Sequence, residues 1–246
     1  MINADNLQLF AADNMALITG PVRGLVLEFP GLDGGSCLGG QTKVGPLRSG
    51  YAIRCARRGI LLVYPFVGPW SWMNDFAVKT TDMIIDAVKQ KYSLPDDIPM
   101  VNSGGSMGGA GALMYTIDGR HKAVACAVSG PACDLLTMES DFPDGVCTVY
   151  RAVAHYDMPY EAAVKRISPL YQLDRLPRIP YFIAHTDADE IIRIEKHSDK
   201  LVKEMRALGH DVTYRVIPGQ AHCDIGPEVQ LEFDNFVFAH AGGQED

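Results

Sequence analysis

The chain has 246 residues, of which 47% are hydrophobic, so it can bury the core of one large α/β domain spanning residues 1–246. A formal net charge of −8 argues against a basic binding face, and we expect no nucleic-acid partner and no membrane partner. The first residues have no basic and then apolar leader, the six cysteines form no C-x-x-C pair, and no apolar run reaches about 18 residues, which together predict a cytoplasmic protein with reduced thiols.

Short apolar runs and helical periodicities alternate along the first half of the chain. The strongest of the runs, GLVLEF, leads into a glycine-rich turn at residues 30–35. Asn74 is a candidate N-cap for a helix that ends near Tyr92. The expected strands cover residues 7–10, 15–19, 24–29, 60–64 and 98–102, and the expected helices cover residues 46–58, 74–92 and 110–117.

The alternation returns near the C-terminus after one interruption. Residues 134–170 are long and only weakly periodic, and we interpret them as a cap insertion. The other expected strands cover residues 123–128, 181–185 and 212–217, with helices at 195–208 and 224–239. This pattern predicts an α/β fold with a mostly parallel sheet of about eight strands and helices on both faces. Active sites in such sheets lie beyond the carboxyl ends of the strands.

The turn after residues 98–102 carries a motif that indicates chemistry. Residues 104–108 read Gly-Gly-Ser-Met-Gly, a G-x-S-x-G sequence between a predicted strand and a predicted helix. Small neighbours relieve the crowding on such a sharp turn, while the Ser106 hydroxyl stays exposed as a nucleophile. The N–H group of Met107, in the first turn of the helix, points where an oxyanion would form. The patterns of phosphate-binding and dinucleotide-binding loops are absent, so no cofactor is expected.

A serine nucleophile needs a base, and the last two predicted strands end beside candidates. A histidine must take the serine proton, and an acid must hold that histidine in the right tautomer. His222 follows the last predicted strand, and Asp189 follows the one before it. Asp187 and Asp134 are alternatives for the acid, because each also lies just beyond a strand. The seven histidines show no metal-ligand spacing, and no metal site is expected.

The order Ser, Asp, His at strand ends is similar to that of the α/β-hydrolase superfamily, and the resemblance covers nearly the whole chain. It is closest to the prolyl oligopeptidase-like and small serine esterase branch. The matching segments are Ser-Pro at 168–169, HTDADEII, Leu-Gly-His at 208–210 and PGQAH. The resemblance implies that Ser106 is the nucleophile, Asp189 the acid and His222 the base.

The resemblance also implies an oxyanion hole shared by Met107 and the loop after GLVLEF. The second donor of this fold is an N–H group in that loop, which we assign to Leu32, with Gly31 and Asp33 as alternatives. The usual His-Gly of the family is replaced here by Pro30-Gly31.

These features predict a serine hydrolase that cleaves carboxylic esters of small apolar, acyl or aryl groups through an acyl-enzyme. The chain leaves no room for the propeller that restricts the oligopeptidases to peptides, and an aminopeptidase or acylpeptide hydrolase without a propeller is the alternative. From a different class, the same fold can serve as a non-catalytic ligand-binding protein, which labelling of Ser106 by a fluorophosphonate would distinguish. A small-molecule ester is the expected partner, and the sequence leaves a homo-oligomer open.

Aromatic residues occur in two segments that should flank the site. The cap at 134–170 contains Phe142 and several tyrosines, and the strand at 60–64 leads to Trp70 and Trp72. We interpret both segments as walls of an apolar pocket, with Trp70 and Trp72 binding substrate. Packing of the cap onto the core is the alternative for each aromatic side chain.

Overall fold

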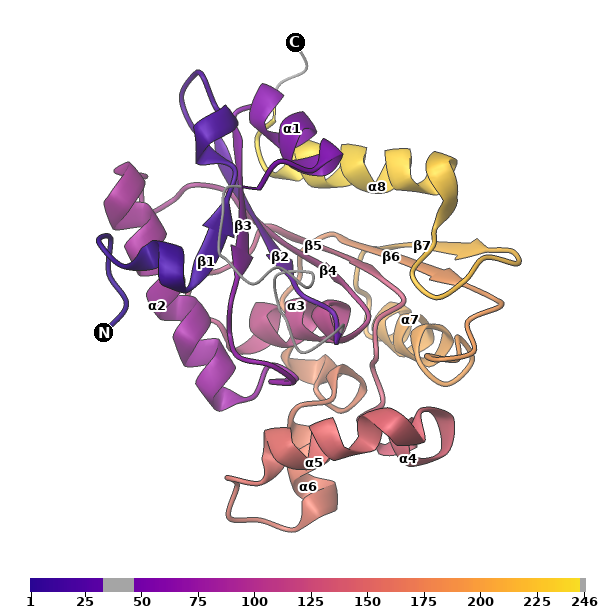
Figure 1. The fold of residues 1–246 in the computed structure, drawn as a ribbon. Helices are drawn as coiled ribbons and strands as arrows, with labels where there is room; N and C mark the ends of the chain where they lie inside the picture. The colour runs from indigo at the N-terminus through magenta and orange to yellow at the C-terminus, as the bar shows by residue number, and fades with distance from the viewer. Residues whose placement is uncertain (33–46, 244–246) are drawn as a thin grey trace.

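A seven-stranded sheet forms the centre of the computed structural model, which describes residues 1–32 and 47–243 (Figure 1). Its order is β1-β3-β2-β4-β5-β6-β7, and every neighbouring pair is parallel except β1 with β3. The strands are β1 (Ala11–Asp13), β2 (Gly24–Phe29), β3 (Ile60–Pro65), β4 (Met100–Gly105), β5 (Ala125–Ser129), β6 (Tyr181–Thr186) and β7 (Val212–Ile217). The mostly parallel sheet is confirmed, with seven strands in these ranges where we expected about eight.

The N-terminal segment differs from the prediction of two short strands. Residues 7–10 and 15–19 instead contain the 3-10 helices Leu7–Leu9 and Met15–Leu17. Strand β1 lies between the two predicted strands and pairs antiparallel with the end of β3. The sheet therefore includes residues that the prediction left between strands.

Asn14 explains why this polar segment joins the sheet. Its side chain is buried, its Oδ1 accepts the N–H of Leu62 at 2.8 Å, and its Nδ2 donates to the carbonyl groups of Ala52 and Ile60. These hydrogen bonds satisfy a buried amide and tie the segment to α1 and β3. Hydrophobic patterning does not reveal side-chain hydrogen bonds of this kind, so the prediction placed strands on either side of the true one.

Helices cover both faces of the sheet (Figure 1). One face carries α1 (Gly50–Arg57) and α8 (Gly226–His240), and the other carries α2 (Asp75–Tyr92), α3 (Met107–Asp118) and α7 (Ser198–Ala207). Asn74 caps α2 as predicted, since its Oδ1 accepts the N–H of Ala77 at 3.1 Å. Residue 46, where we expected a helix to begin, lies outside the described ranges, within which no helix is long and apolar enough to span a bilayer.

Side chains along β2 show how the two faces are built. Leu25, Leu27 and Phe29 belong to the hydrophobic cluster of α2 and α3, whereas Val26 belongs to that of α1 and α8. Because successive side chains point to opposite faces and both faces are covered, most of β2 is apolar. Glu28 is the charged exception, and it lies on the same face as Val26.

Residues 134–170, the segment interpreted as a cap and called the cap below, contain short helices after β5. The helices are α4 (Met138–Asp141), α5 (Val146–Val153) and α6 (Tyr160–Arg166), which lie together on the side of α3 away from α8 (Figure 1). The buried Val149 and Val164 of the cap belong to one hydrophobic cluster with Met107 and Ala110 of α3. The cap therefore packs near the first turns of the helix that follows Ser106.

Candidate active site

Ser106 occupies a strained turn between β4 and α3. Its backbone has φ 57° and ψ −124°, a region that residues with a Cβ rarely adopt. The N–H of Ser106 donates to the carbonyl of Ser129 at 3.0 Å, and the Ser106 carbonyl accepts the N–H of Ala110 at 3.1 Å. The turn is thus held by backbone hydrogen bonds on both sides, and it presents the hydroxyl beyond the carboxyl end of β4.

The glycines of the motif have a steric reason. A Cβ on Gly104 would lie 2.6 Å from the carbonyl carbon of Gly108, and a Cβ on Gly108 would lie 2.0 Å from the carbonyl oxygen of Phe29. Both distances are far shorter than real contacts, so the close approach of β2, β4 and α3 requires glycine at these positions. The local sequence therefore determines the turn that exposes Ser106.

Asp189 and His222 meet beyond the ends of β6 and β7. Nδ1 of His222 lies 2.5 Å from Oδ2 of Asp189. The other carboxylate oxygen accepts the N–H groups of Ile191 and Ile192 at 2.9 and 2.8 Å. Burial raises the pKa of Asp189, but the hydrogen bonds from His185, His222 and the backbone outweigh burial and hold it well below its usual value. Asp189 is therefore ionised at neutral pH and fixes the proton of His222 on Nδ1.

His185, which the sequence analysis does not single out, is a second partner of Asp189. Its Nε2 lies 3.2 Å from Oδ2 of Asp189 and 2.8 Å from the carbonyl oxygen of Ile192, and its Nδ1 lies 2.6 Å from Oγ of Ser198. With acceptors around Nε2, the imidazole donates there and orients the carboxylate. The signal in the sequence was its position at the end of β6, four residues before Asp189.

The two alternative acids lie elsewhere. Asp187 accepts the N–H of Gly219 at 2.7 Å and so joins the two loops to each other. Asp134 caps a 3-10 turn of the cap by accepting the N–H of Leu136 at 3.2 Å. Neither carboxylate contacts His222 within the ranges that the structure describes.

Cys223 faces the other nitrogen of His222, which the sequence did not lead us to expect. Its Sγ lies 3.5 Å from Nε2 of His222 and 3.6 Å from the carbonyl oxygen of Ser129, and its backbone has φ 62°. Burial lowers the pKa of His222, but its contacts with Asp189 and Cys223 outweigh burial and raise the pKa above the usual value. The Ser106 hydroxyl makes no hydrogen bond within the described part of the chain.

One cavity of 540 Å³ is lined by Ser106, His222 and Cys223 together. Its walls are mostly apolar and aromatic. The described lining residues are Glu28, Phe29, Gly31, Leu32, Tyr64, Trp72, Gly105, Ser106, Met138, Phe142, Ile191, Ile192, His222 and Cys223.

The predicted oxyanion and substrate residues differ in their placement. Leu32 and Gly31 line the cavity, Asp33 lies outside the described residues, and Met107 is buried at the start of α3. Trp72 lines the cavity although it is only 2% exposed, and its Nε1 donates to Oγ1 of Thr148 in the cap at 2.9 Å.

Trp70 lies apart from Trp72. It is partly buried, and it is not among the described residues that line the cavity. Trp72 therefore agrees with both interpretations, because it lines the pocket and also packs against the cap. Of the two tryptophans, Trp72 alone is among the described residues that line the cavity. No group of three His, Cys, Asp or Glu side chains in residues 1–32 and 47–243 could hold a metal ion.

Comparison with known proteins gives one family. The model of the prolyl oligopeptidase family matches residues 79–242, and no match was found among curated protein sequences. A truncated carbohydrate esterase from gut microbiota is similar in structure, with a TM-score of 0.66 and 14% identity over 90% of this chain and 86% of that one.

Two further solved structures are similar. Esterase B from Lactobacillus rhamnosis has a TM-score of 0.68 and 13% identity, covering 91% of this chain and 76% of that one. The acylaminoacyl peptidase of Pyrococcus horikoshii has a TM-score of 0.66 and 16% identity, and the 93% of this chain that is covered corresponds to 38% of that one. At such identities the likeness concerns the fold, which is that of the α/β-hydrolases. Because the family model matches well over half of the chain, including Ser106, Asp189 and His222, this protein belongs to the prolyl oligopeptidase family and is a serine hydrolase of the α/β-hydrolase fold.

Proposed function

We propose that the protein hydrolyses carboxylic esters through an acyl-enzyme on Ser106. The observation that carries the proposal is that Ser106 and His222 line one cavity, with Asp189 2.5 Å behind His222. Oγ of Ser106 attacks the ester carbonyl while Nε2 of His222 takes its proton. The alcohol leaves with that proton, and a water molecule then hydrolyses the acyl-serine by the same route.

The oxyanion of each tetrahedral intermediate needs two N–H donors. The N–H of Met107 opens α3, where the first amides have no partner within the helix. Leu32 follows the end of β2 and lines the same cavity, so its N–H is our choice for the second donor. A missing donor of this kind typically lowers kcat by about 10²- to 10³-fold.

The cavity walls favour small apolar substrates. The cavity has a volume of 540 Å³, which fits a short acyl or aryl group better than a folded polypeptide. Its apolar walls include Phe29, Trp72, Met138, Phe142 and Ile191. Apolar walls exclude water, which strengthens the hydrogen bonds at the reacting carbonyl. We therefore place esters with short acyl chains or aryl groups first among the substrates.

Peptide hydrolysis is the second candidate, and the match of residues 79–242 to a peptidase family favours it. The experiment that separates the two candidates compares p-nitrophenyl esters of increasing chain length with aminoacyl-nitroanilides, on the wild-type protein and on Ser106→Ala. Ester turnover that disappears in Ser106→Ala, with little anilide turnover, supports the proposal. Anilide kcat/KM values equal to those of the esters would favour the peptidase. Absence of both activities and of fluorophosphonate labelling at Ser106 would indicate a non-catalytic protein.

A further inference from the structure

Glu28 is an acidic side chain inside the candidate active site. It lies in β2, opposite Ser103 of β4 in the parallel register, and it lines the cavity that Ser106 and His222 also line. It is the only acidic residue among the described lining residues. The mechanism proposed above gives it no role.

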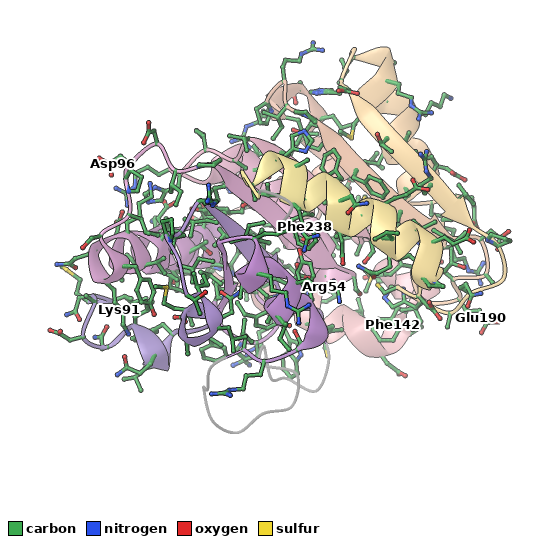
Figure 2. All side chains as sticks on the ribbon, turned by 90° about the horizontal axis from the view of Figure 1, so that it is seen from above. Arg54, Lys91, Asp96, Phe142, Glu190 and Phe238 are labelled. Carbon is green, nitrogen blue, oxygen red and sulfur yellow. The ribbon has the colours of Figure 1, made fainter. Side chains whose placement is uncertain are left out.

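Within residues 1–32 and 47–243, Glu28 forms no ion pair. Arg54 of α1, the helix that covers this face of the sheet, is paired with Asp234 of α8 at 2.5 Å. Figure 2 shows Arg54 beside α8. A partly buried carboxylate without a cation is costly, because burial disfavours its charged form.

The polar groups near Glu28 offset its burial only in part. Burial raises the pKa of Glu28 to about 7, the Ser103 side chain opposes the rise, and the charge of Asp234 adds to it. The charge of Glu28 in turn helps to raise the pKa of Tyr51 and of Cys55 on α1. Among the described residues, Glu28 therefore has a raised pKa, acidic neighbours and no ion-pair partner.

A ligand cation in the cavity would change this balance. An ammonium group beside Glu28 would stabilise the carboxylate by a charge-assisted hydrogen bond, and the surrounding walls would exclude water from the pair. Phe29, Tyr64 and Trp72 line the same cavity and supply apolar and aromatic surface for the alkyl part of such a ligand.

We propose that Glu28 binds a positively charged group of the substrate, so that the preferred substrates are esters carrying an ammonium group. This inference rests on the proposed ester hydrolysis and refines its substrate class. Binding by Glu28 would orient one end of the substrate while Ser106 attacks the carbonyl at the other, with no change in the chemical steps. Glu28 is then a specificity residue, and its effect appears mainly in KM.

Matched ester pairs test the proposal directly. p-Nitrophenyl 6-aminohexanoate and p-nitrophenyl heptanoate differ by an ammonium in place of a methyl on the acyl side. Butanoylcholine and 3,3-dimethylbutyl butanoate differ on the alcohol side by a quaternary nitrogen in place of a quaternary carbon, so this pair tests attraction of the charge without an N–H donor. We expect kcat/KM of the wild-type protein to favour the charged member of at least one pair by about tenfold or more, mostly through KM. Glu28→Gln should bring that ratio close to one.

Glu190→Gln is the control for the general field of the protein. Glu190 is exposed, it lies at the edge of the molecule in Figure 2, and it is not among the described residues that line the cavity. This variant should keep the wild-type ratio within about twofold, because exposed charges are screened by solvent and salt. An equal drop in Glu190→Gln and Glu28→Gln would attribute the preference to net charge and overturn the proposal.

A second measurement needs no variant. For the preferred pair, the kcat/KM ratio of charged to neutral ester should rise as the pH increases through about 7, because Glu28 ionises there while an alkylammonium stays protonated. The common dependence on His222 cancels in the ratio. Hydrolysis of the neutral esters with no preference for either charged ester, or with a preference independent of pH, would overturn this inference and leave the proposed ester hydrolysis standing. Failure to hydrolyse any of the four esters would instead remove the proposed function itself.

Discussion

The loops after β6 and β7 differ from the cap in how their side chains are held. In the loops, the carboxylate of Asp189 accepts two backbone N–H groups and lies between two histidines. The cap is joined to the rest of the molecule by side-chain pairs, such as Trp72 with Thr148 and Asp75 with Arg166. Backbone hydrogen bonds fix one arrangement, whereas a side-chain pair can be changed without moving the reacting groups. We therefore expect turnover and selectivity to depend on different parts of the molecule.

The largest expected effect comes from the reacting groups. Ser106→Ala and His222→Ala should each lower kcat for the best ester by about four to six orders of magnitude, because nucleophile and base act as a unit. The double variant should be no worse than either single one. Steady-state assays of ester hydrolysis measure the loss of kcat, and an unchanged Tm shows that folding is intact. A residual activity near that of wild type in either variant would disprove its assignment.

Asp189→Asn should have the next largest effect, a loss of about three to four orders of magnitude in kcat. The pH dependence of kcat/KM provides a second test, with a defined direction. His222 must be neutral to accept the proton, so kcat/KM falls as the pH drops through its raised pKa, and the acid limb of the wild-type profile should lie above the ordinary value of 6.5. Removing the negative charge of Asp189 should move that limb to lower pH.

Asp187→Asn and Asp134→Asn are the matched controls for this assignment. Both keep the hydrogen bond between His222 and Asp189, so both should keep the position of the acid limb. If the acid limb of the pH profile moved in Asp134→Asn and did not move in Asp189→Asn, the catalytic acid would be Asp134 and not Asp189.

The glycine turn should show its effect in stability. Gly108→Ala places a Cβ 2.0 Å from the carbonyl oxygen of Phe29 and should lower the free energy of unfolding by about 3 kcal/mol or more. Gly111→Ala in the same helix is the control, because its Cβ would first meet the Cε of Met73 at 3.4 Å, and alanine favours a helix. Urea unfolding measures both. A smaller loss in Gly108→Ala than in Gly111→Ala would contradict the steric account.

The sequence predicted the parts of the site that depend on local pattern. G-x-S-x-G between an apolar run and a helix placed Ser106, and polar residues just past apolar strands placed Asp189 and His222. These features need only neighbours along the chain and the rule that parallel strands end at one edge. The catalytic roles, the cytoplasmic location and the oligomeric state stay predictions.

The remaining parts depend on contacts between distant segments. Glu28 reaches the cavity through the register of β2 with β4, and Cys223 faces His222 because its backbone adopts φ 62°. The spacing of Trp70 and Trp72 placed both beyond β3, but only the fold brings Trp72 against Thr148 of the cap. Patterns within one segment carry no information on such pairs, which is also why β1 was predicted at the wrong residues.

Trp72→Phe tests whether the contacts between the cap and the rest of the molecule affect substrate selectivity. It removes the hydrogen bond from Nε1 to Thr148 and some cavity wall, and should cost about 1 to 2 kcal/mol of stability while changing the ranking of long and short esters. Fluorophosphonate labelling of Ser106 should stay within a few fold of wild type. Thr148→Val removes the same hydrogen bond, but Thr148 is not among the described lining residues, so stability should fall without a change in ranking. Identical rankings in wild type and Trp72→Phe would assign Trp72 to packing alone.

The smallest effect should come from Asp75, whose carboxylate holds the cap through Arg166 at 2.9 Å and Tyr156 at 3.0 Å. Burial raises the pKa of Asp75, but the hydrogen bonds from Arg166 and Tyr156 outweigh burial and lower it. A lowered pKa means that the carboxylate stabilises the folded state above its unfolded pKa of 3.8, and that this stability is lost as the pH falls through the folded value. Asp75→Asn keeps the shape and removes the charge, so it should cost about 0.5 to 1 kcal/mol at pH 7, as for a partly exposed pair, and less near pH 2. Urea unfolding at the two pH values measures this difference. A cost that is equal at both would mean that the shape of the side chain, rather than its charge, ties the cap to α2.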